Sequence, residues 1–275
     1  MSSENDPLDH KTKIVGILNV TPNSFSDGGQ FLEPEKALAH AYKLIEDGAD
    51  VIDVGAESTA PDAVAISVEE EQRRLEEVLP QVIEAAHSAK VEVSIDTRNA
   101  STASIALRAG VDYVNDQGGL SDPNMVPVIR ESHTKVVVMH SLGLPVSRSR
   151  YSACSPEDLM REIIEWLRAR VDTLVSNGVH REDIIVDPGI GFGKLPEHSW
   201  YIMRNIRMLS ELGVKTYVGH SRKSPFSSLS IPLTDRDVPT AIVSAFLMQQ
   251  GVDFIRVHNV EMTKLARDIS RKLQA

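Results

Sequence analysis

The chain has 275 residues, of which 25% are charged and 41% are hydrophobic, a mixture that is typical of folded globular proteins. Its formal net charge of −10 argues against a nucleic acid or an anionic membrane as partner, because either would require a basic face. Its single cysteine, Cys154, excludes an intrachain disulfide, and no apolar run is long enough to span a membrane.

The first element along the chain is a polar segment, residues 1–12, which we predict to be a flexible tail. It lacks the apolar core of a signal peptide, so we expect a cytoplasmic protein. The sequence leaves the oligomeric state open, and a homodimer is one expectation.

From residue 13 onwards, apolar runs typical of strands alternate with segments of helical spacing. We predict strands at residues 13–19, 51–55, 91–96, 111–115, 135–140, 184–187, 214–219 and 254–257. We predict helices at residues 34–47, 67–86, 100–109, 126–132, 156–177, 197–211, 240–250 and 260–273. This alternation indicates a parallel sheet, and eight strand–helix pairs predict a single-domain (β/α)8 TIM barrel over residues 13–275. An open, doubly wound sheet is the alternative, but it commonly uses fewer strands.

Local signals support several of these helix limits. Ser67 and Glu70 have the spacing of a capping box, and Pro156 suits the first turn of the long helix that follows it. Gly48 and Gly110 follow predicted helices directly, where glycine commonly ends a helix.

The stretch 184–194, with the sequence IIVDPGIGFGK, combines a buried strand with a glycine-rich loop. The apolar run ends at Asp187, and Pro188 and the three glycines that follow exclude further strand or a regular helix. A carboxylate at the end of a buried strand, followed by backbone that a ligand can approach closely, predicts a binding site. The alternative is a tight turn whose aspartate only caps the next helix.

Polar or charged residues stand at the carboxyl ends of all eight predicted strands. They are Asn19, Glu57 with Ser58 and Thr59, Asp96, Asn115 with Asp116, His140, Asp187, Lys223, and Arg256 with His258. For one strand a cap or turn would explain the residue. Because the strands of a (β/α)8 barrel all end at one face, eight such residues predict a polar pocket there.

The predicted pocket has two chemical characters. Asp96, Asn115 and Asp187 supply acceptors and an amide, which suit a flat heterocycle that carries N–H and NH₂ donors. The donors Lys223, Ser224, Arg256 and His258 suit an anion such as phosphate, and Asn19 could complete a Mg²⁺ shell of water and phosphate oxygens. No cluster at zinc spacing and no compelling Ser-His-Asp set is present, so nucleophilic hydrolysis is not favoured.

Several of these segments resemble the signatures of the dihydropteroate synthases, a family of pterin-binding enzymes. The matching segments are residues 17–29 (ILNVTPNSFSDGG), 53–59 (DVGAEST), 95–97, 115–116, 139–140, 187–194, 221–224 (SRKS) and 255–258 (IRVH). They occur in the family's order over roughly residues 14–273. Each is weakly specific alone, and together they are highly specific.

The resemblance implies that 4-aminobenzoate displaces diphosphate from (7,8-dihydropterin-6-yl)methyl diphosphate with Mg²⁺, an alkyl transfer of folate synthesis. It implies that the catalytic residues are Asp27, Asp96, Asp187 and Lys223, and that Asn19 lies near the metal. The implied substrate contacts are Thr59, Pro61, Asp96, Asn115, Met139, Asp187, Phe192, Gly219, Lys223, Ser224, Arg256 and His258. Phe25 and Asp27 would lie on a mobile first loop that closes over the site.

The sequence departs from the family on the diphosphate and aminobenzoate side. Ala60 stands where an arginine commonly contacts diphosphate, Asn23 replaces an aspartate, and Ala56 replaces a glycine. Pro225 and Phe226 follow Lys223-Ser224 where the family usually continues Phe-aliphatic-Gly. These changes leave the sharing of charge around the diphosphate open, and they raise the hypothesis of reduced sulfonamide sensitivity with retained use of 4-aminobenzoate.

Two other interpretations stay open at this point. One is a corrinoid-linked methyltransferase domain that binds methyltetrahydrofolate on a similar barrel, but it would have no use for the donors Arg256, His258 and Ser224. The other is a non-catalytic paralogue that keeps the pterin half of the site, and Ala60 and Pro225 are its support.

Overall fold

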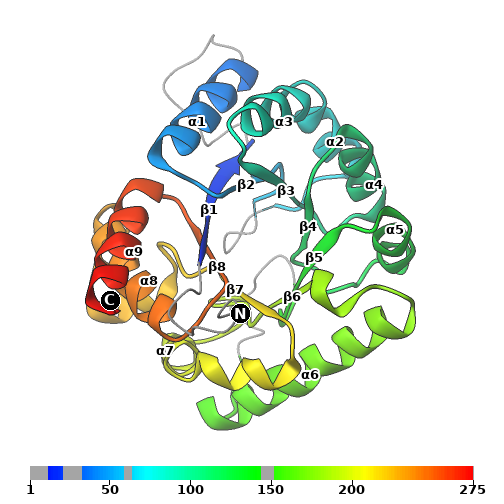
Figure 1. Cartoon of the computed structure of the whole chain (residues 1–275). Coiled ribbons are helices and arrows are strands. Elements are labelled where there is room, and N and C mark those ends of the chain that lie inside the picture. The colour runs from blue at the N-terminus through cyan, green and yellow to red at the C-terminus, as the bar shows by residue number, and fades with distance from the viewer. Residues whose placement is uncertain (1–11, 21–32, 59–63, 144–151, 275) are drawn as a thin grey trace, which may run out of the picture.

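The computed structural model describes residues 12–20, 33–58, 64–143 and 152–274. Eight parallel strands form one closed barrel in chain order, and helices surround it (Figure 1). The last strand pairs with the first, with Lys13 opposite Phe254, which closes the ring. The predicted fold class, a single-domain (β/α)8 barrel, is therefore confirmed.

The strands are short and begin and end close to the predicted positions. They are β1 Lys13–Asn19, β2 Val51–Gly55, β3 Glu92–Asp96, β4 Tyr113–Asp116, β5 Lys135–Met139, β6 Ile184–Asp187, β7 Lys215–Val218 and β8 Phe254–Val257. Most of their residues are buried, as expected of a parallel sheet that is covered on both faces. This explains why the strands appear in the sequence as continuous apolar runs.

The helices alternate with the strands, with several extra short elements. The α-helices are α1 Glu33–Asp47, α2 Val68–Glu76, α3 Val78–Ser88, α4 Ala100–Ala109, α5 Met125–Ser132, α6 Pro156–Ser176, α7 Pro196–Arg204, α8 Asp237–Gln249 and α9 Val260–Gln274. The 3₁₀ helices are η3 Arg181–Asp183, η4 Ile206–Leu212, η5 Ser224–Leu229 and η6 Leu233–Asp235.

Two helices predicted as continuous are divided, and a third begins earlier than predicted. The segment 67–86 separates into α2 and α3 at Glu77, because Pro80 cannot donate to the carbonyl of Glu76 and its ring would clash with it. The segment 197–211 ends as α7 at Arg204 and continues as the 3₁₀ helix η4. Helix α8 begins at Asp237, since Pro239 lies in its first turn, where no N–H is needed.

The predicted N-terminal cap Ser67 is in place, and Ser155 caps α6 in the same way. Ser67 Oγ accepts from the backbone N–H of Glu70 at 3.2 Å, and Ser155 Oγ accepts from that of Asp158 at 3.1 Å. The second half of the expected capping box is not formed, because the Glu70 carboxylate pairs with Arg73 and Arg74 instead. Pro156 occupies the first turn of α6, as predicted.

The interior of the barrel is layered, and the layers position the site. Seven inward-facing side chains form a closed apolar floor: Val15, Val51, Tyr113, Val137, Ile185, Tyr217 and Phe254. Because side chains on a strand alternate between faces, the residues two positions further along also point inward. These are Ile17, Asp53, Asn115, Met139, Asp187, Gly219 and Arg256. The floor therefore confines the polar layer to the carboxyl ends of the strands.

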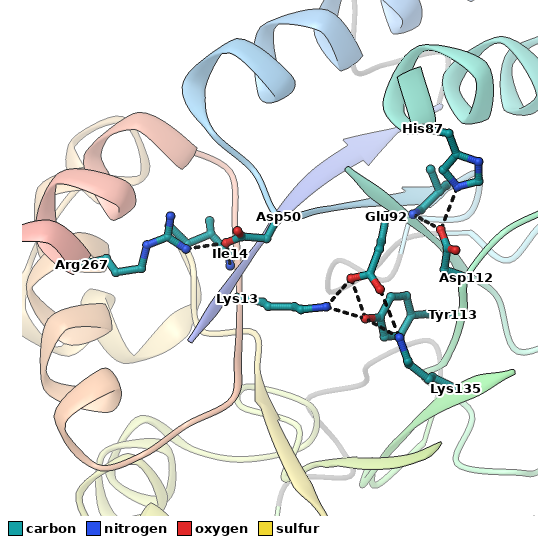
Figure 2. A network of polar contacts seen from close by, with 10 residues as sticks. Lys13, Ile14, Asp50, His87, Glu92, Asp112, Tyr113, Lys135 and Arg267 are labelled. Atoms are coloured by element: carbon teal, nitrogen blue, oxygen red, sulfur yellow. Dashed lines mark hydrogen bonds and ion pairs between the residues drawn. The ribbon is translucent and has the colours of Figure 1, made fainter. Parts of the chain in front are cut away.

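The opposite, amino-terminal face carries a charge network that does not include any predicted site residue (Figure 2). The carboxylate of Glu92 accepts from Lys13, from the Tyr113 hydroxyl at 2.8 Å and from Lys135 at 3.1 Å. Partial burial would raise the pKa of Glu92, but these hydrogen bonds outweigh it and lower the pKa. The ionised carboxylate therefore stabilises the fold.

Glu92→Gln is expected to lower the free energy of unfolding by about 1 kcal/mol at pH 7, since the network is only partly shielded from water. Because folding lowers this pKa, the stabilisation is present above the unfolded value of about 4.3 and is lost as the pH falls below it. Thermal unfolding of both proteins at pH 7 and pH 4 measures this: the difference in Tm should shrink at pH 4. An equal difference at both values would contradict the assignment.

Candidate active site

A cavity of about 550 Å³ opens at the carboxyl ends of the strands. Its lining includes nine of the predicted residues, namely Asn19, Asp96, Phe192, Lys223, Ser224, Arg256, His258 and the rim residues Glu57 and Ser58. A separate hollow of about 630 Å³ lies beside the amino-terminal ends of β4, β5 and β6 and contains none of them. The first cavity is the candidate active site, since it unites side chains from β1, β3 and β8 and from the segments after β6 and β7.

Asp96 and Arg256 form the centre of the polar layer together with a third residue, Asp53. Arg256 Nε donates to Asp53 Oδ2 at 2.6 Å, and Nη2 donates to Asp96 Oδ2 at 2.8 Å. Burial raises the pKa of Asp96 to about 8, against the opposing charge of Arg256. Two buried carboxylates thus share one guanidinium, and the charge of Asp53 further favours a proton on Asp96.

Asp187 lies in the same layer, where β6 passes into the glycine-rich loop. Its Oδ1 accepts the backbone N–H of Gly189 at 2.7 Å. Burial raises its pKa, and the nearby charge of Lys223 opposes that shift. Asn115 is buried on β4, between the strands that carry Asp96 and Met139. The predicted acceptors Asp96, Asn115 and Asp187 therefore belong to one inward-facing layer.

The glycine-rich loop keeps its course because of its first glycine. Gly189 has φ +68, and a Cβ there would lie 1.9 Å from the carbonyl oxygen of His140. The same carbonyl accepts from Lys194 Nζ at 3.1 Å, and Nζ also donates to Phe192 O at 3.1 Å. Lys194 is fully buried, and burial lowers its pKa to about 7. The loop thus closes around an ammonium group.

The predicted donors of the cavity are one lysine, one arginine and neutral groups, and Arg222 and Arg236 also line it. Lys223 Nζ lies 4.2 Å from the centroid of the Phe192 ring, and burial lowers the pKa of Lys223 to about 8. Burial, aided by the charge of Arg222, lowers the pKa of His258 to about 3. His258 is therefore neutral at pH 7, so it can donate a hydrogen bond to a ligand without a positive charge.

Ser221 orients His258. Its hydroxyl lies 2.9 Å from His258 Nδ1 and accepts the backbone N–H of His258 at 3.2 Å. The hydroxyl proton can then be given to Nδ1, which leaves the proton of the ring on Nε2. Arg222 is turned to the carboxylate of Asp237, with distances of 2.6 and 2.7 Å.

Three polar residues predicted at the rim have other contacts. Glu57 accepts two hydrogen bonds from Arg98, at 2.8 and 2.9 Å. The carboxylate of Asp116 accepts the backbone N–H groups of Gly118 and Leu120. The ring of His140 packs edge-on against Trp166, with centroids 5.1 Å apart. For Asp116 and His140 the simpler interpretation, a turn or packing residue, explains the position.

Two further predicted residues, Met139 and Gly219, are buried in the layer around the cavity. Met139 is paired with Asp187 in the sheet, and a Cβ on Gly219 would lie 3.7 Å from Lys223 Nζ and 3.8 Å from the Arg256 side chain. The predicted residues Phe25, Asp27, Thr59 and Pro61 lie outside the described residues, as do Asn23 and Ala60.

Four polar residues near the site were missed in the sequence: Asp53, Gln117, Lys194 and Arg236. Gln117 Nε2 donates to Asp96 Oδ2. Arg236 borders the cavity, and its Nη1 donates to the carbonyls of Arg222 and Lys223 at 2.9 and 3.2 Å. Arg236 stands in an irregular segment without any signal. For Asp53 the sequence did carry a signal, because Asp53 is the first residue of the matched segment 53–59.

The described residues contain no group of three His, Cys, Asp or Glu side chains that could hold a metal ion by themselves. They do place Asn19 in the lining of the cavity that also contains the donors that suit an anion. One amide oxygen fits Mg²⁺ that is held mainly by phosphate oxygens and water, which is how this ion is usually bound.

In the described part of the chain, no helix is long and apolar enough to cross a membrane.

Comparison with known proteins matches residues 15–258 to the family of pterin binding enzymes. "Dihydropteroate synthase type-3" of Escherichia coli is 35% identical over 95% of this chain and 99% of its own length. A "probable bifunctional folylpolyglutamate synthase/dihydropteroate synthase" of Haloferax volcanii is 41% identical over 92% of this chain, which spans only 30% of that protein.

A solved structure of dihydropteroate synthase from Anaplasma phagocytophilum with bound 6-hydroxymethylpterin-monophosphate has 58% identity and a TM-score of 0.90. The superposition covers 95% of this chain and 99% of that one. Since the family match runs from β1 to the residue after β8 and includes every described strand that carries the polar layer, this chain belongs to the pterin-binding enzyme family.

Proposed function

We propose that this chain is a dihydropteroate synthase, which joins 4-aminobenzoate to (7,8-dihydropterin-6-yl)methyl diphosphate and releases diphosphate. The observation that carries the proposal is the division of one cavity into acceptors and donors. Asp96 in the cavity lining, together with Asn115 and Asp187 in the same inward-facing layer, suits the N–H and NH₂ edge of a pterin. The lining residues Lys223, Ser224, Arg256 and His258 suit an anion. The motifs that resemble this family and its relatives support the same assignment.

The geometry supports a reaction driven by positioning and charge. As the bond between the methylene carbon and the leaving oxygen weakens, positive charge develops on the pterin and negative charge on diphosphate. Positive charge on the bound pterin favours the ionised forms of Asp96 and Asp187, and these carboxylates stabilise the pterin cation, whereas Arg256 and Lys223 stabilise the anion. The aniline nitrogen then attacks the methylene carbon. We assign no strong general base to the described site, because the amine is already neutral at pH 7.

The departures at the diphosphate side are compatible with this proposal where the structure describes them. Pro225 lies in the first turn of η5, where a backbone N–H is not needed, and it is buried. Phe226 is buried and packs edge-on against Trp200, with centroids 5.9 Å apart. Both residues therefore stabilise the segment after Lys223.

Mg²⁺ is part of the proposal, with Asn19 as the protein ligand and the remaining positions filled by diphosphate and water. Bound there, the ion would neutralise charge on the leaving diphosphate. Thr59 and Pro61 beside the aminobenzoate, and Phe25 and Asp27 on the first loop, stay predictions from the resemblance. The tail of residues 1–12 also stays a prediction, although Thr12 itself is buried and its hydroxyl donates to Val252 O at 2.8 Å.

The test is product formation by the purified chain. With both substrates and Mg²⁺, diphosphate and 7,8-dihydropteroate should appear in equal amounts. A non-catalytic paralogue would bind the pterin diphosphate and release nothing, and a corrinoid-linked domain would bind methyltetrahydrofolate instead. Adding a sulfonamide to the same assay measures its inhibition constant against the KM for aminobenzoate, which tests the hypothesis of reduced sensitivity.

A homodimer through α8 and α9 is also part of the proposal. The two helices expose an apolar patch, made of Val238, Ile242, Phe246, Leu265, Ile269 and Leu273. Charges of both signs, Glu261, Lys264, Asp268 and Arg271, alternate along the exposed side of α9. A twofold axis packs the patch of one subunit against the same patch of the other subunit, so positive and negative side chains of α9 can pair across the interface. These features favour a second copy of the chain as the partner.

We also propose a cytoplasmic location, because a chain with a single cysteine has no need of an oxidising compartment to form intrachain disulfides.

Ile242→Glu is expected to convert the dimer to a monomer, because it would bury a charge in the apolar contact. Analytical ultracentrifugation of the wild type and the variant measures the mass. Ile105→Glu is the matched control, since Ile105 is an exposed isoleucine on another helix, α4. A wild-type chain that stays monomeric at all concentrations would contradict the proposal.

A further inference from the structure

Asp53 lies beneath the cavity and contacts two residues of the proposed pterin site. One of its carboxylate oxygens, Oδ2, accepts from Arg256 Nε at 2.6 Å and from Asn115 Nδ2 at 3.0 Å. Asp53 is fully buried on β2, whereas Asn115 and Arg256 are on β4 and β8. A single oxygen atom therefore fixes side chains from two distant strands of the barrel.

We propose that Asp53 is a positioning residue that sets the donor and acceptor pattern of the pocket, so that the pocket selects a heterocycle with a donor-rich edge. This inference rests on the proposed function and deepens it. Asp53 itself does not need to touch the substrate. Its effect is exerted through the orientation of Asn115 and the place of Arg256.

The orientation of Asn115 follows from charge. An amide can turn either its oxygen or its nitrogen to a neighbour, but an ionised carboxylate can only accept hydrogen bonds. Asp53 therefore requires the NH₂ group of Asn115 to face it, and the amide oxygen is directed elsewhere. Asp96 Oδ2 and Asp187 Oδ1 also accept hydrogen bonds in the structure, the first from Arg256 and Gln117 and the second from the Gly189 N–H. The three residues together therefore present acceptors to a ligand. A ring edge with N–H and NH₂ groups fits them, and one with carbonyl groups does not.

The place of Arg256 follows from its two partners. In the structure Nη2 donates to Asp96, the carboxylate that we assign to the pterin edge, and Nε donates to Asp53. A ligand that donates to Asp96 competes with Nη2 for that oxygen. Because Nε stays on Asp53, the guanidinium can give up this hydrogen bond and keep its position beside the anion. Without Asp53, Asp96 would be the stronger attraction for the whole guanidinium.

The buried environment makes this role stronger than that of an ordinary ion pair. Asp53 Oδ1 is buried and has no hydrogen-bond partner among the described residues, so the carboxylate is incompletely satisfied. An unpaired oxygen of this kind is unfavourable for stability. A carboxylate kept for stability alone would be expected to have both oxygens paired, as in Glu71, whose oxygens accept from Thr97, Asn99 and Thr102.

The test compares two ligands of the same shape by calorimetry, 6-hydroxymethylpterin and its lumazine analogue, in which a carbonyl replaces the 2-amino group. The variants are Asp53→Asn and the exchanged pair Asp53→Asn with Asn115→Asp. The exchanged pair keeps one carboxylate and one amide in contact, and it again presents an acceptor at position 115. Asp50→Asn is the matched control, since Asp50 pairs with Arg267 and the backbone N–H of Ile14 at the opposite face (Figure 2).

We expect the wild type to bind the pterin at least about 100-fold more tightly than the lumazine, because an analogue without the donor leaves buried acceptors of the site unpaired. Asp53→Asn should reduce this ratio at least tenfold, and the exchanged pair should restore most of it. Asp50→Asn should lower Tm and leave the ratio unchanged. A structural role alone would change Tm in all variants and the ratio in none.

The outcomes distinguish a failure of the proposed function from a failure of the role proposed for Asp53. A wild-type chain that binds no pterin and forms no dihydropteroate would refute the proposed function. A wild-type chain that does both, while Asp53→Asn keeps the ligand ratio of the wild type, would refute the role of Asp53 alone. If Asp53→Asn does not fold, the exchanged pair decides: a folded exchanged pair without preference for the pterin also refutes it.

Discussion

Asp187→Asn is expected to lower kcat/KM for dihydropteroate formation by about 10²- to 10³-fold, with little loss of stability. The carboxylate lies at the end of β6 with Lys223 and Lys194 near it, and burial removes the water that would otherwise weaken these charges. Removing one charge from such a site typically costs about 3–4 kcal/mol of transition-state binding. Asparagine has the same shape and keeps an oxygen for the Gly189 N–H, so the loop should keep its course.

The measurement is steady-state kinetics with each substrate varied in turn. Both kcat and the KM for the pterin substrate should change, because Asp187 is proposed to hold the pterin in the ground state and to stabilise its cation in the transition state. Asp253→Asn is the matched control, since Asp253 also accepts a backbone N–H, that of Thr216 at 2.8 Å, but at the amino-terminal face. Turnover of Asp187→Asn within a fewfold of the wild type would remove Asp187 from the site.

The fold could be predicted because the barrel depends on a pattern that local sequence carries. Buried parallel strands require apolar runs, and the runs at residues 13–19 and 254–257 gave β1 and β8 with the predicted limits. Two of the wrong helix limits have a common cause, the position of proline. Pro80 divides a predicted helix, whereas Pro239 lies inside one that we began only after it. The effect of a proline depends on its distance from the helix start, and the sequence alone did not fix that start.

The candidate site could be predicted where a polar residue stands at or beside the end of a strand, as Asp96, Asn115 and Asp187 do. Asp53 escaped notice as a site residue because it stands within β2, two residues before its end. Its inward direction depends on the alternation that also places Val51 in the floor, and this required the register of the barrel. The charge state of His258 depends on burial and on Arg222, neither of which a motif shows.

Lys194→Met is expected to have the largest effect on stability among the site variants. The substitution leaves the carbonyl oxygens of His140 and Phe192 without their buried donor, and each unpaired group typically costs about 1–3 kcal/mol. We therefore expect Tm to fall by about 5–15 °C. The glycine-rich loop that carries Phe192 should loosen, and because Lys223 lies over the Phe192 ring, kcat/KM should fall as well.

The pH dependence of this stability distinguishes a buried ammonium from ordinary packing. The pKa of Lys194 is lowered by burial to about 7, and that of lysine in an unfolded chain is about 10.4. Between these values the unfolded chain binds more protons at this position, so the contribution of Lys194 to stability increases as the pH rises. The difference in Tm between the wild type and Lys194→Met should therefore grow from pH 7 to pH 9. A constant difference would show that position 194 acts only by its volume, and that the ammonium group does not titrate inside the loop.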